Sequence, residues 1–249
     1  MRLLSGSLTL SSVLALALAG CASSVPTDES LAAPGDEDAV VESRGYTYFA
    51  IASDQRKCAF PVCGGWFLEQ LNRSTTTCHN GTLAAQCYTP VLDWSNANLS
   101  VDQQVTMLNA CTQPLSEGVY AIVRGQFARR NTTTPRPDLG RFVITEAWVA
   151  EADMPSSGTF VRLHDNGLRC FAPPCPSLTE TTLNLSTSVD ISGIDWTPSA
   201  MTDAQIEECT GDLITPDGLL VAGARYTFTE NGTPATGRTV TVAYQRLLP

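Results

Sequence analysis

Lys57-Cys58-Ala59-Phe60-Pro61-Val62-Cys63 is the stretch on which the fold depends, because it recurs as Arg169-Cys170-Phe171-Ala172-Pro173-Pro174-Cys175. A basic residue, both cysteines and one proline coincide in the two copies. Further matches follow in the same order: Leu71-Asn72 with Leu183-Asn184, Asp93-Trp94 with Asp195-Trp196, and Ser100 and Gln103 with Thr202 and Gln205. Ordered self-similarity of this kind predicts an internal duplication. The segment from Cys78 to Cys87 accounts for the extra length of the first copy, as an inserted loop.

Hydrophobic alternation predicts five strands and one helix in each copy. Ser100-x-x-Gln103 and Thr202-x-x-Gln205 have capping-box spacing and open the two predicted helices. The order is three strands, a helix and two strands, which is the order of the OB-fold, a small five-stranded barrel. A flat α+β sheet has the same order and stays open as an alternative. The strands are expected at 46–52, 66–71, 91–94, 119–127 and 142–150, then at 159–164, 180–186, 189–196, 219–228 and 238–247, with helices at 101–110 and 203–209.

The sequence therefore predicts a mostly β protein with short helices, built as two tandem disulfide-stapled modules. The modules are expected at 45–152 and 153–249. Residues 21–44 precede them and are rich in Ser, Ala, Pro and acidic residues, with few large apolar side chains. Such a segment cannot bury enough surface to fold, so we expect a disordered acidic tether.

The N-terminus has the layout of a secretory signal peptide over residues 1–20. Arg2 precedes an apolar run that is too short to cross a bilayer, and the run ends at Leu18-Ala19-Gly20-Cys21. This ending resembles the lipobox of bacterial lipoproteins. The resemblance implies export, cleavage before Cys21, and lipidation of Cys21 as an anchor in the bilayer. Ala22 follows the cysteine in place of the aspartate that retains lipoproteins at the inner membrane, which favours the outer membrane, on its periplasmic or surface face.

The remaining eight cysteines predict a disulfide framework, since an even number in an exported protein favours bridges over metal sites. Local bridges are expected where two cysteines flank a short loop. One bridge across the two modules is expected for the remaining two, although many other connectivities are open. The predicted pairs are Cys58 with Cys63, Cys78 with Cys87, Cys170 with Cys175, and Cys111 with Cys209.

Charge and motifs argue against several function classes. The formal net charge is −10 with only 15 Lys and Arg, which is a poor match for a nucleic-acid partner. The two histidines, His79 and His164, are not repeated between the copies. The sequence contains no nucleophile elbow, zinc-protease helix or phosphate loop. We therefore expect no enzyme, no metal and no cofactor, with a carboxylate-dependent hydrolase as the least favoured alternative.

The repeated Asp-Trp pairs are the candidate binding residues. Asp93 with Trp94, and Asp195 with Trp196, would face a ligand from equivalent surfaces of the two modules. The structural interpretation is that each Asp ends a strand and each Trp fills a core beside the helix. The repeated Asn72 and Asn184 are open to the same two interpretations, sugar contact or a turn.

The repeated Arg/Lys-Cys-x-x-Pro-x-Cys module, with its Leu-Asn and Asp-Trp followers, resembles an uncharacterised family of exported bacterial proteins. The resemblance covers about residues 45–249 and implies no catalytic residues. We expect a lipid-anchored protein that binds envelope glycan or a protein partner without catalysis. A structural or assembly lipoprotein is the alternative from another class.

Overall fold

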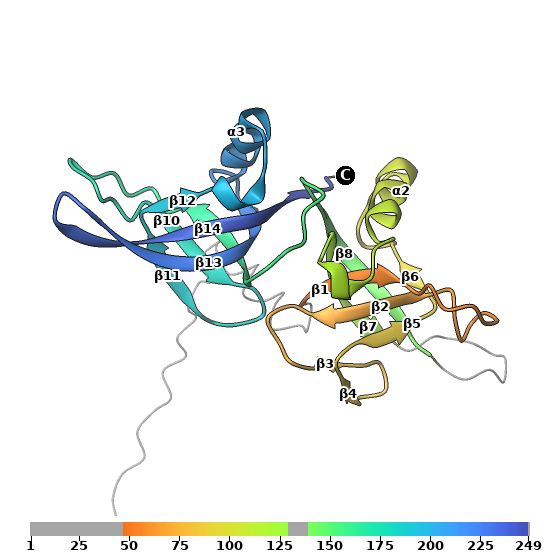
Figure 1. Cartoon of the computed structure of the whole chain (residues 1–249). Helices are drawn as coiled ribbons and strands as arrows, with labels where there is room; N and C mark the ends of the chain where they lie inside the picture. Colours follow the sequence, from red (N-terminus) through yellow and green to blue (C-terminus); the bar gives the residue numbers. More distant parts are fainter. Residues whose placement is uncertain (1–46, 129–138, 249) are drawn as a thin grey trace, which may run out of the picture. The chain divides into compact units, whose positions relative to one another are not determined.

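The computed structural model describes residues 47–128 and 139–248 (Figure 1). The predicted signal peptide, the lipidation site at Cys21 and the whole predicted tether over 21–44 lie outside the described residues. The described residues fall within one compact unit. None of their helices is long and apolar enough to cross a membrane.

The first half of this unit runs from β1 to β8. Its strands are β1 (Thr47–Ser53), β2 (Trp66–Gln70), β3 (Thr76–Thr77), β4 (Leu83–Ala84), β5 (Cys87–Thr89), β6 (Leu92–Asp93), β7 (Ala121–Ala128) and β8 (Arg141–Ala150), with helix α2 (Val101–Ala110) between β6 and β7. The short β3 and β4 form a separate hairpin, in which β3 directly precedes Cys78 and β4 lies within the segment from Cys78 to Cys87.

The second half runs from β9 to β14 and repeats the element order without the inserted hairpin. Its strands are β9 (Thr159–Asp165), β10 (Leu178–Thr182), β11 (Ser188–Ile191), β12 (Gly193–Asp195), β13 (Leu219–Glu230) and β14 (Thr233–Arg246), with helix α3 (Asp203–Asp212) between β12 and β13. The predicted strand at 189–196 is split into β11 and β12. The predicted strand at 91–94 is β6, and β5 precedes it as a strand that was not predicted. Both predicted capping boxes are present, at Ser100 and at Thr202.

The main sheet follows the order β11-β10-β9-β13-β14-β8-β7-β1-β2-β5 and is open along this path. Outside the path, β6 pairs in parallel with β8 and β12 pairs in parallel with β14. The two halves join where β14 and β8 pair antiparallel, with Tyr244 opposite Ala150. The predicted mostly β class is therefore confirmed. The predicted boundary at 152/153 falls between β8 and β9 and stays a prediction.

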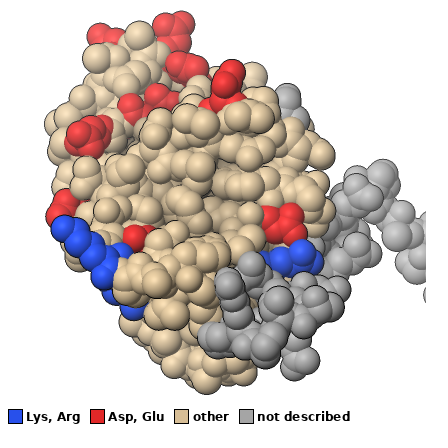
Figure 2. Space-filling view, turned by 90° about the vertical axis from the view of Figure 1, so that its right-hand side faces the viewer, with Lys and Arg blue, Asp and Glu red and all other residues tan. Residues whose placement is uncertain are grey.

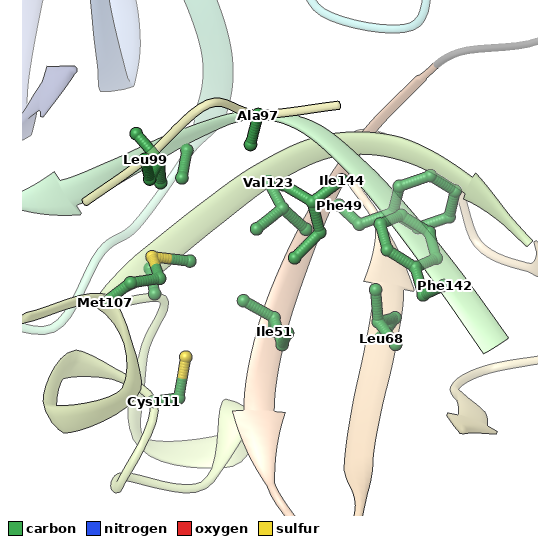
Figure 3. Packing of buried hydrophobic residues seen from close by; sticks show 12 residues of the cluster. Phe49, Ile51, Leu68, Ala97, Leu99, Met107, Cys111, Val123, Phe142 and Ile144 are labelled. Atoms are coloured by element: carbon green, nitrogen blue, oxygen red, sulfur yellow. The ribbon is translucent and has the colours of Figure 1, made fainter. Parts of the chain in front are cut away.

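Each half has its own hydrophobic core, and a third core is shared. The first core contains Phe49, Ile51, Leu68 and Phe142, and Met107 of α2 belongs to the same cluster (Figure 3). The second core contains Val161, Leu163 and Ile191 beneath α3. The shared core combines residues of both halves, including Tyr48, Leu71, Leu183 and Tyr244. Burial at this seam is what makes the two halves one unit.

Two repeated asparagines connect the halves, because the side chain of each one forms hydrogen bonds with the backbone of the other half. Asn72 donates from Nδ2 to the carbonyls of Phe160 and Leu183, at 2.7 and 2.9 Å, and its Oδ1 accepts from the Phe160 amide at 2.9 Å. Asn184 makes the same three kinds of bond to Tyr48 and Leu71 of the first half. Both asparagines have a positive φ, 57° and 60°, a conformation that Asn tolerates better than most residues. The side-chain amides of both asparagines are therefore hydrogen-bonded within the protein.

Candidate functional site

A cavity lies at the same strand positions in each half. In the first half Phe49 is opposite Gln70, and in the second Val161 is opposite Thr182. A register shift falls just before Gly125 in β7 and just before Gly223 in β13. A Cβ on either glycine would lie within about 2 Å of a carbonyl oxygen of the neighbouring strand, at 2.2 Å for Gly125 and 1.8 Å for Gly223. Both bulges therefore require glycine.

Beyond the bulges, the same register pairs different residues in the two halves. Phe127 is opposite Phe142 in the first half, and Arg225 is opposite Arg238 in the second. On the neighbouring strands, Leu68 pairs with Ile51 where Glu180 pairs with Leu163. Three apolar positions of the first half are thus three charged positions of the second.

The first-half cavity has a volume of about 310 Å³ and an aromatic floor. The ring of Phe142 packs edge-to-face against Phe49 and Phe127, with centroid distances of 5.0 Å in both cases. The inserted loop supplies part of the wall through His79. The cavity is lined by Thr47, Phe49, Gln70, Thr77, Cys78, His79, Gln126 and Phe127.

The second-half cavity has a volume of about 330 Å³ and an ionic floor. It is lined by Thr159, Glu180, Thr182, Leu185, Thr187, Arg225 and Arg238. A volume of this size is at the lower end of the roughly 300–1,000 Å³ typical of small-molecule sites. It is the candidate functional site, because its lining combines hydroxyl groups with an ion cluster.

Glu180 is the centre of the ion cluster and is fully buried, whereas Arg225 on the same carboxylate keeps 39% of its side chain exposed. Arg238 is 2% exposed and holds Glu180 with two nitrogens, Nε on Oε2 and Nη2 on Oε1 at 2.7 Å. Its Nη1 donates to the Thr159 carbonyl at 3.3 Å. Arg225 donates from Nε to Glu180 Oε1 at 2.7 Å.

Burying such ions costs desolvation free energy that their attraction seldom exceeds by much, so a buried ion cluster is weak evidence for stability. One carboxylate between two guanidinium groups also leaves the cluster with a net positive charge. Among the described residues, the lining of this cavity has no cysteine, serine or histidine, and its one carboxylate is held by arginines. The arrangement is suited to holding a polar or anionic group.

Charge is sparse elsewhere on the visible surface. On the face shown in Figure 2, Asp and Glu gather toward the upper part, and Lys and Arg are few. One other carboxylate of the described residues, Glu146, also pairs with two arginines, Arg124 and Arg246.

The Asp-Trp pairs predicted as binding residues do not line either cavity. Asp93 accepts a hydrogen bond from the Ser95 amide and pairs with Arg141 at 3.2 Å, and the hydrogen bonds from Ser95 hold its pKa below the usual range. Asp195 accepts a hydrogen bond from the Thr197 amide, and hydrogen bonds from the side chain and the amide of Thr197 lower the pKa of Asp195. Trp94 packs against the first core and Trp196 against the second. A ligand at these residues stays a prediction.

Three of the four predicted disulfides form, Cys58–Cys63, Cys78–Cys87 and Cys170–Cys175. The predicted bridge between Cys111 and Cys209 is wrong. Cys111 ends α2 in the first core, whereas Cys209 lies in α3 in the second core, so the two thiols are buried in different places. Burial raises the pKa of each thiol to about 12, which makes both unreactive at neutral pH.

The two histidines are separated as well. His79 lines the first cavity, and the Nε2 of His164 lies 3.1 Å from the Pro216 carbonyl in the second half. Within the described residues, no group of three or more His, Cys, Asp and Glu side chains is arranged to hold a metal ion.

Sequence reasoning missed Glu180, Arg225 and Arg238 because it searched for residues that the two copies share. The signal that could have found them is the alternation of inward and outward positions along each strand. Glu180 occupies an inward position in Leu178–Thr182, where its counterpart Leu68 is apolar. A charge at an inward strand position needs a buried partner, and the arginines of the last two strands supply it.

Comparison with known proteins identifies one family. A family model described as a domain of unknown function (DUF6748) matches residues 47–249. No curated protein and no solved structure matches the chain.

Proposed function

The chain belongs to the DUF6748 family, whose function is unknown, and from that premise we propose that it is a non-catalytic binding lipoprotein of the bacterial cell envelope. Its ligand is a glycan, held in the second-half cavity. The lipid on Cys21 anchors the chain in the bilayer, and residues 21–44 hold the folded part away from the membrane, where an envelope polymer is within reach.

The proposal includes an OB-like module in each half. It is supported by the strand neighbours, because β5 pairs with β2 and the next strand along the chain, β6, pairs with β8 on the other side of β7 and β1. The parallel pairing of β6 with β8 and of β12 with β14, and a helix before the last two strands, occur in both halves. OB-like modules bind oligosaccharides and oligonucleotides on their strand faces, and the acidic charge disfavours the second ligand.

One observation carries the choice of ligand and site: a cavity lined by three threonines and an exposed arginine over a buried carboxylate. Thr159, Thr182 and Thr187 offer hydroxyl groups that both donate and accept, as sugar hydroxyls do. Arg225 adds a charged donor. A set of convergent polar groups in a concave site is the pattern expected for a small-molecule or sugar site.

The test is co-sedimentation of the full, oxidised chain with purified peptidoglycan sacculi at moderate salt. Thr187→Trp fills the cavity from an exposed position, and Thr227→Trp is the matched control on an exposed position of β13 outside the lining. We expect the native chain and the Thr227 variant to pellet with sacculi and the Thr187 variant to stay in the supernatant. Equal pelleting of both variants, or no pelleting of the native chain, contradicts the proposal.

A protein partner is the second candidate, favoured by exposed apolar side chains on both Cys-x4-Cys loops. Phe171 is fully exposed in the second-half loop, and Phe60 and Val62 are more than half exposed in the first. Exposed apolar side chains that form a contiguous patch are typical of contact sites. Cross-linking in cells that weakens on Phe171→Ser, while sacculus binding is unchanged, would favour this candidate.

A further inference from the structure

We propose that the second-half cavity selects a sugar that carries a carboxylate, and that Arg225 is the residue that binds this carboxylate. The inference rests on the proposed glycan-binding function and narrows its ligand class. It is carried by the unequal use of the two arginines that share Glu180.

Arg238 is fully engaged and Arg225 is not. Three nitrogens of Arg238 have hydrogen-bond partners, two on Glu180 and one on Thr159, and the side chain is almost wholly buried. Within residues 47–128 and 139–248, Nε is the one nitrogen of Arg225 with a hydrogen-bond partner. Its guanidinium is held from one side by Glu180 and lines the cavity. Its remaining donors are available to a ligand.

The charge balance of the cluster favours a ligand with a single negative charge. Glu180 neutralises one of the two guanidinium groups, so one positive charge is left uncompensated beside the cavity. A carboxylate balances that charge and matches the planar fork of a guanidinium with two parallel hydrogen bonds. A dianionic phosphate would leave excess negative charge next to buried Glu180.

The threonines supply the part of the site that recognises a sugar. Thr182 is buried, whereas Thr159 and Thr187 are exposed at the cavity mouth. Hydroxyls of this kind bond sugar hydroxyls without regard to charge, so they give affinity for neutral and acidic sugars alike. Discrimination between the two therefore depends on Arg225.

The first half provides an internal contrast. The position of Arg225 is taken by Phe127, and that of Glu180 by Leu68, so the first-half cavity has no charged group to bind an anion at these positions. An acidic sugar should therefore bind at the second half alone, and each chain should bind one equivalent.

The experiment is isothermal titration of the full, oxidised chain in mild detergent with a matched pair of disaccharides. One is N-acetylglucosamine linked to N-acetylmuramic acid, and the other is chitobiose, which lacks the lactyl carboxylate. N-acetylglucosamine 6-phosphate serves as the phosphate probe. We expect one equivalent of the acidic disaccharide to bind about 10- to 100-fold more tightly than chitobiose, the range of a hydrogen bond between charged groups.

Two variants of Arg225 and one control locate the effect. Arg225→Leu should bind both disaccharides equally, and its fold should persist because Glu180 keeps Arg238 as partner. Arg225→Lys keeps the positive charge but loses the planar guanidinium. It should therefore retain part of the preference for the acidic disaccharide over chitobiose. Arg169→Leu changes the net charge equally at an exposed arginine that pairs with Asp165 outside the cavity, and should bind like the native chain.

The possible failures are distinguishable. Equal binding of both disaccharides to the native chain overturns the carboxylate assignment and leaves glycan binding standing. A preference for the phosphate probe, or a preference for acid that survives Arg225→Leu, also overturns it. If neither disaccharide binds and sacculi do not sediment the chain, the inference and the proposed function both fail.

Discussion

The two halves of this protein have the same strand register but different residue types at three matched interior positions. At three matched positions the first half has Leu68, Phe127 and Phe142, which belong to or pack against one hydrophobic cluster. Figure 3 shows Leu68 and Phe142 in this cluster. The second half has Glu180, Arg225 and Arg238 at the same positions. The first half shows that apolar residues suffice at these three positions, although it has an ion cluster of its own elsewhere, in which Glu146 pairs with Arg124 and Arg246. We attribute the ions of the second-half cavity to ligand binding.

The largest effect is expected when one member of the ion cluster is removed. Glu180→Leu gives the second half the residue of the first but leaves Arg238 buried without its carboxylate. An uncompensated buried charge costs about 3–5 kcal/mol. Chemical denaturation should show a loss of this size in the free energy of unfolding. A loss below about 1 kcal/mol would mean that Arg238 finds water, and the contrast between the halves would weaken.

The matched change in the first half should be costly for a different reason. Leu68→Ala removes a fully buried side chain and leaves a cavity, which costs about 2–5 kcal/mol. The same denaturation measurement gives the loss, and sugar binding by the remaining folded protein should be unchanged. Altered sugar affinity would contradict the assignment of the site to the second half alone.

A smaller loss of stability is expected when hydrogen bonds between the two halves are removed. Asn184→Gly keeps a residue that tolerates a positive φ but removes three hydrogen bonds to Tyr48 and Leu71, at an expected cost of about 1–3 kcal/mol. Asn98→Gly is the control, because Asn98 has a φ of 53° and an exposed side chain. Equal effects of the two changes would show that the backbone, not the exchanged side chain, matters at the seam.

The smallest effect concerns pH and the loop after β1. Asp54 accepts hydrogen bonds from the Arg56 side chain at 2.9 Å, which lowers the pKa of Asp54, whereas Asn166 occupies the corresponding place before Cys170. A lowered folded-state pKa stabilises the protein above the unfolded value near ~3.9, and this stabilisation is lost as the pH falls through the folded value.

Asp54→Asn makes the first loop resemble the second. The melting temperature should fall by roughly 2–4 °C at pH 7. Scanning calorimetry across the acid range should show the difference between the native chain and the variant shrinking below pH ~4. A difference that grows on acidification would have the wrong sign for a carboxylate stabilised in its charged form.

The sequence was sufficient for features that depend on local patterns. The capping boxes at Ser100 and Thr202, the class of fold and the three short-range disulfides all follow from spacing. The Cys111–Cys209 bridge could not be judged in this way, because it depends on which core each helix covers. The same holds for Asn72 and Asn184, whose partners belong to the other half of the chain and are far away in sequence.

The candidate site was missed because the search followed the residues that match between the two halves of the sequence. Residues that both copies keep, such as the Asp-Trp pairs, are found at strand ends and in cores, where each copy needs them to fold. Where the residues differ at matched inward positions, one half contains a residue that the other half does not need for folding. Glu180 and its arginines become visible only when the register assigns each residue its counterpart.

The most direct test of this account is the free energy of unfolding of the triple variant Glu180→Leu, Arg225→Phe and Arg238→Phe. It gives the second half the interior of the first. Replacing a buried ion cluster by apolar residues is often neutral or stabilising, so we predict a stability equal to or above that of the native chain, together with loss of acidic-sugar binding. A variant several kcal/mol less stable, measured by denaturation, would show that the ions serve the fold and would contradict the account.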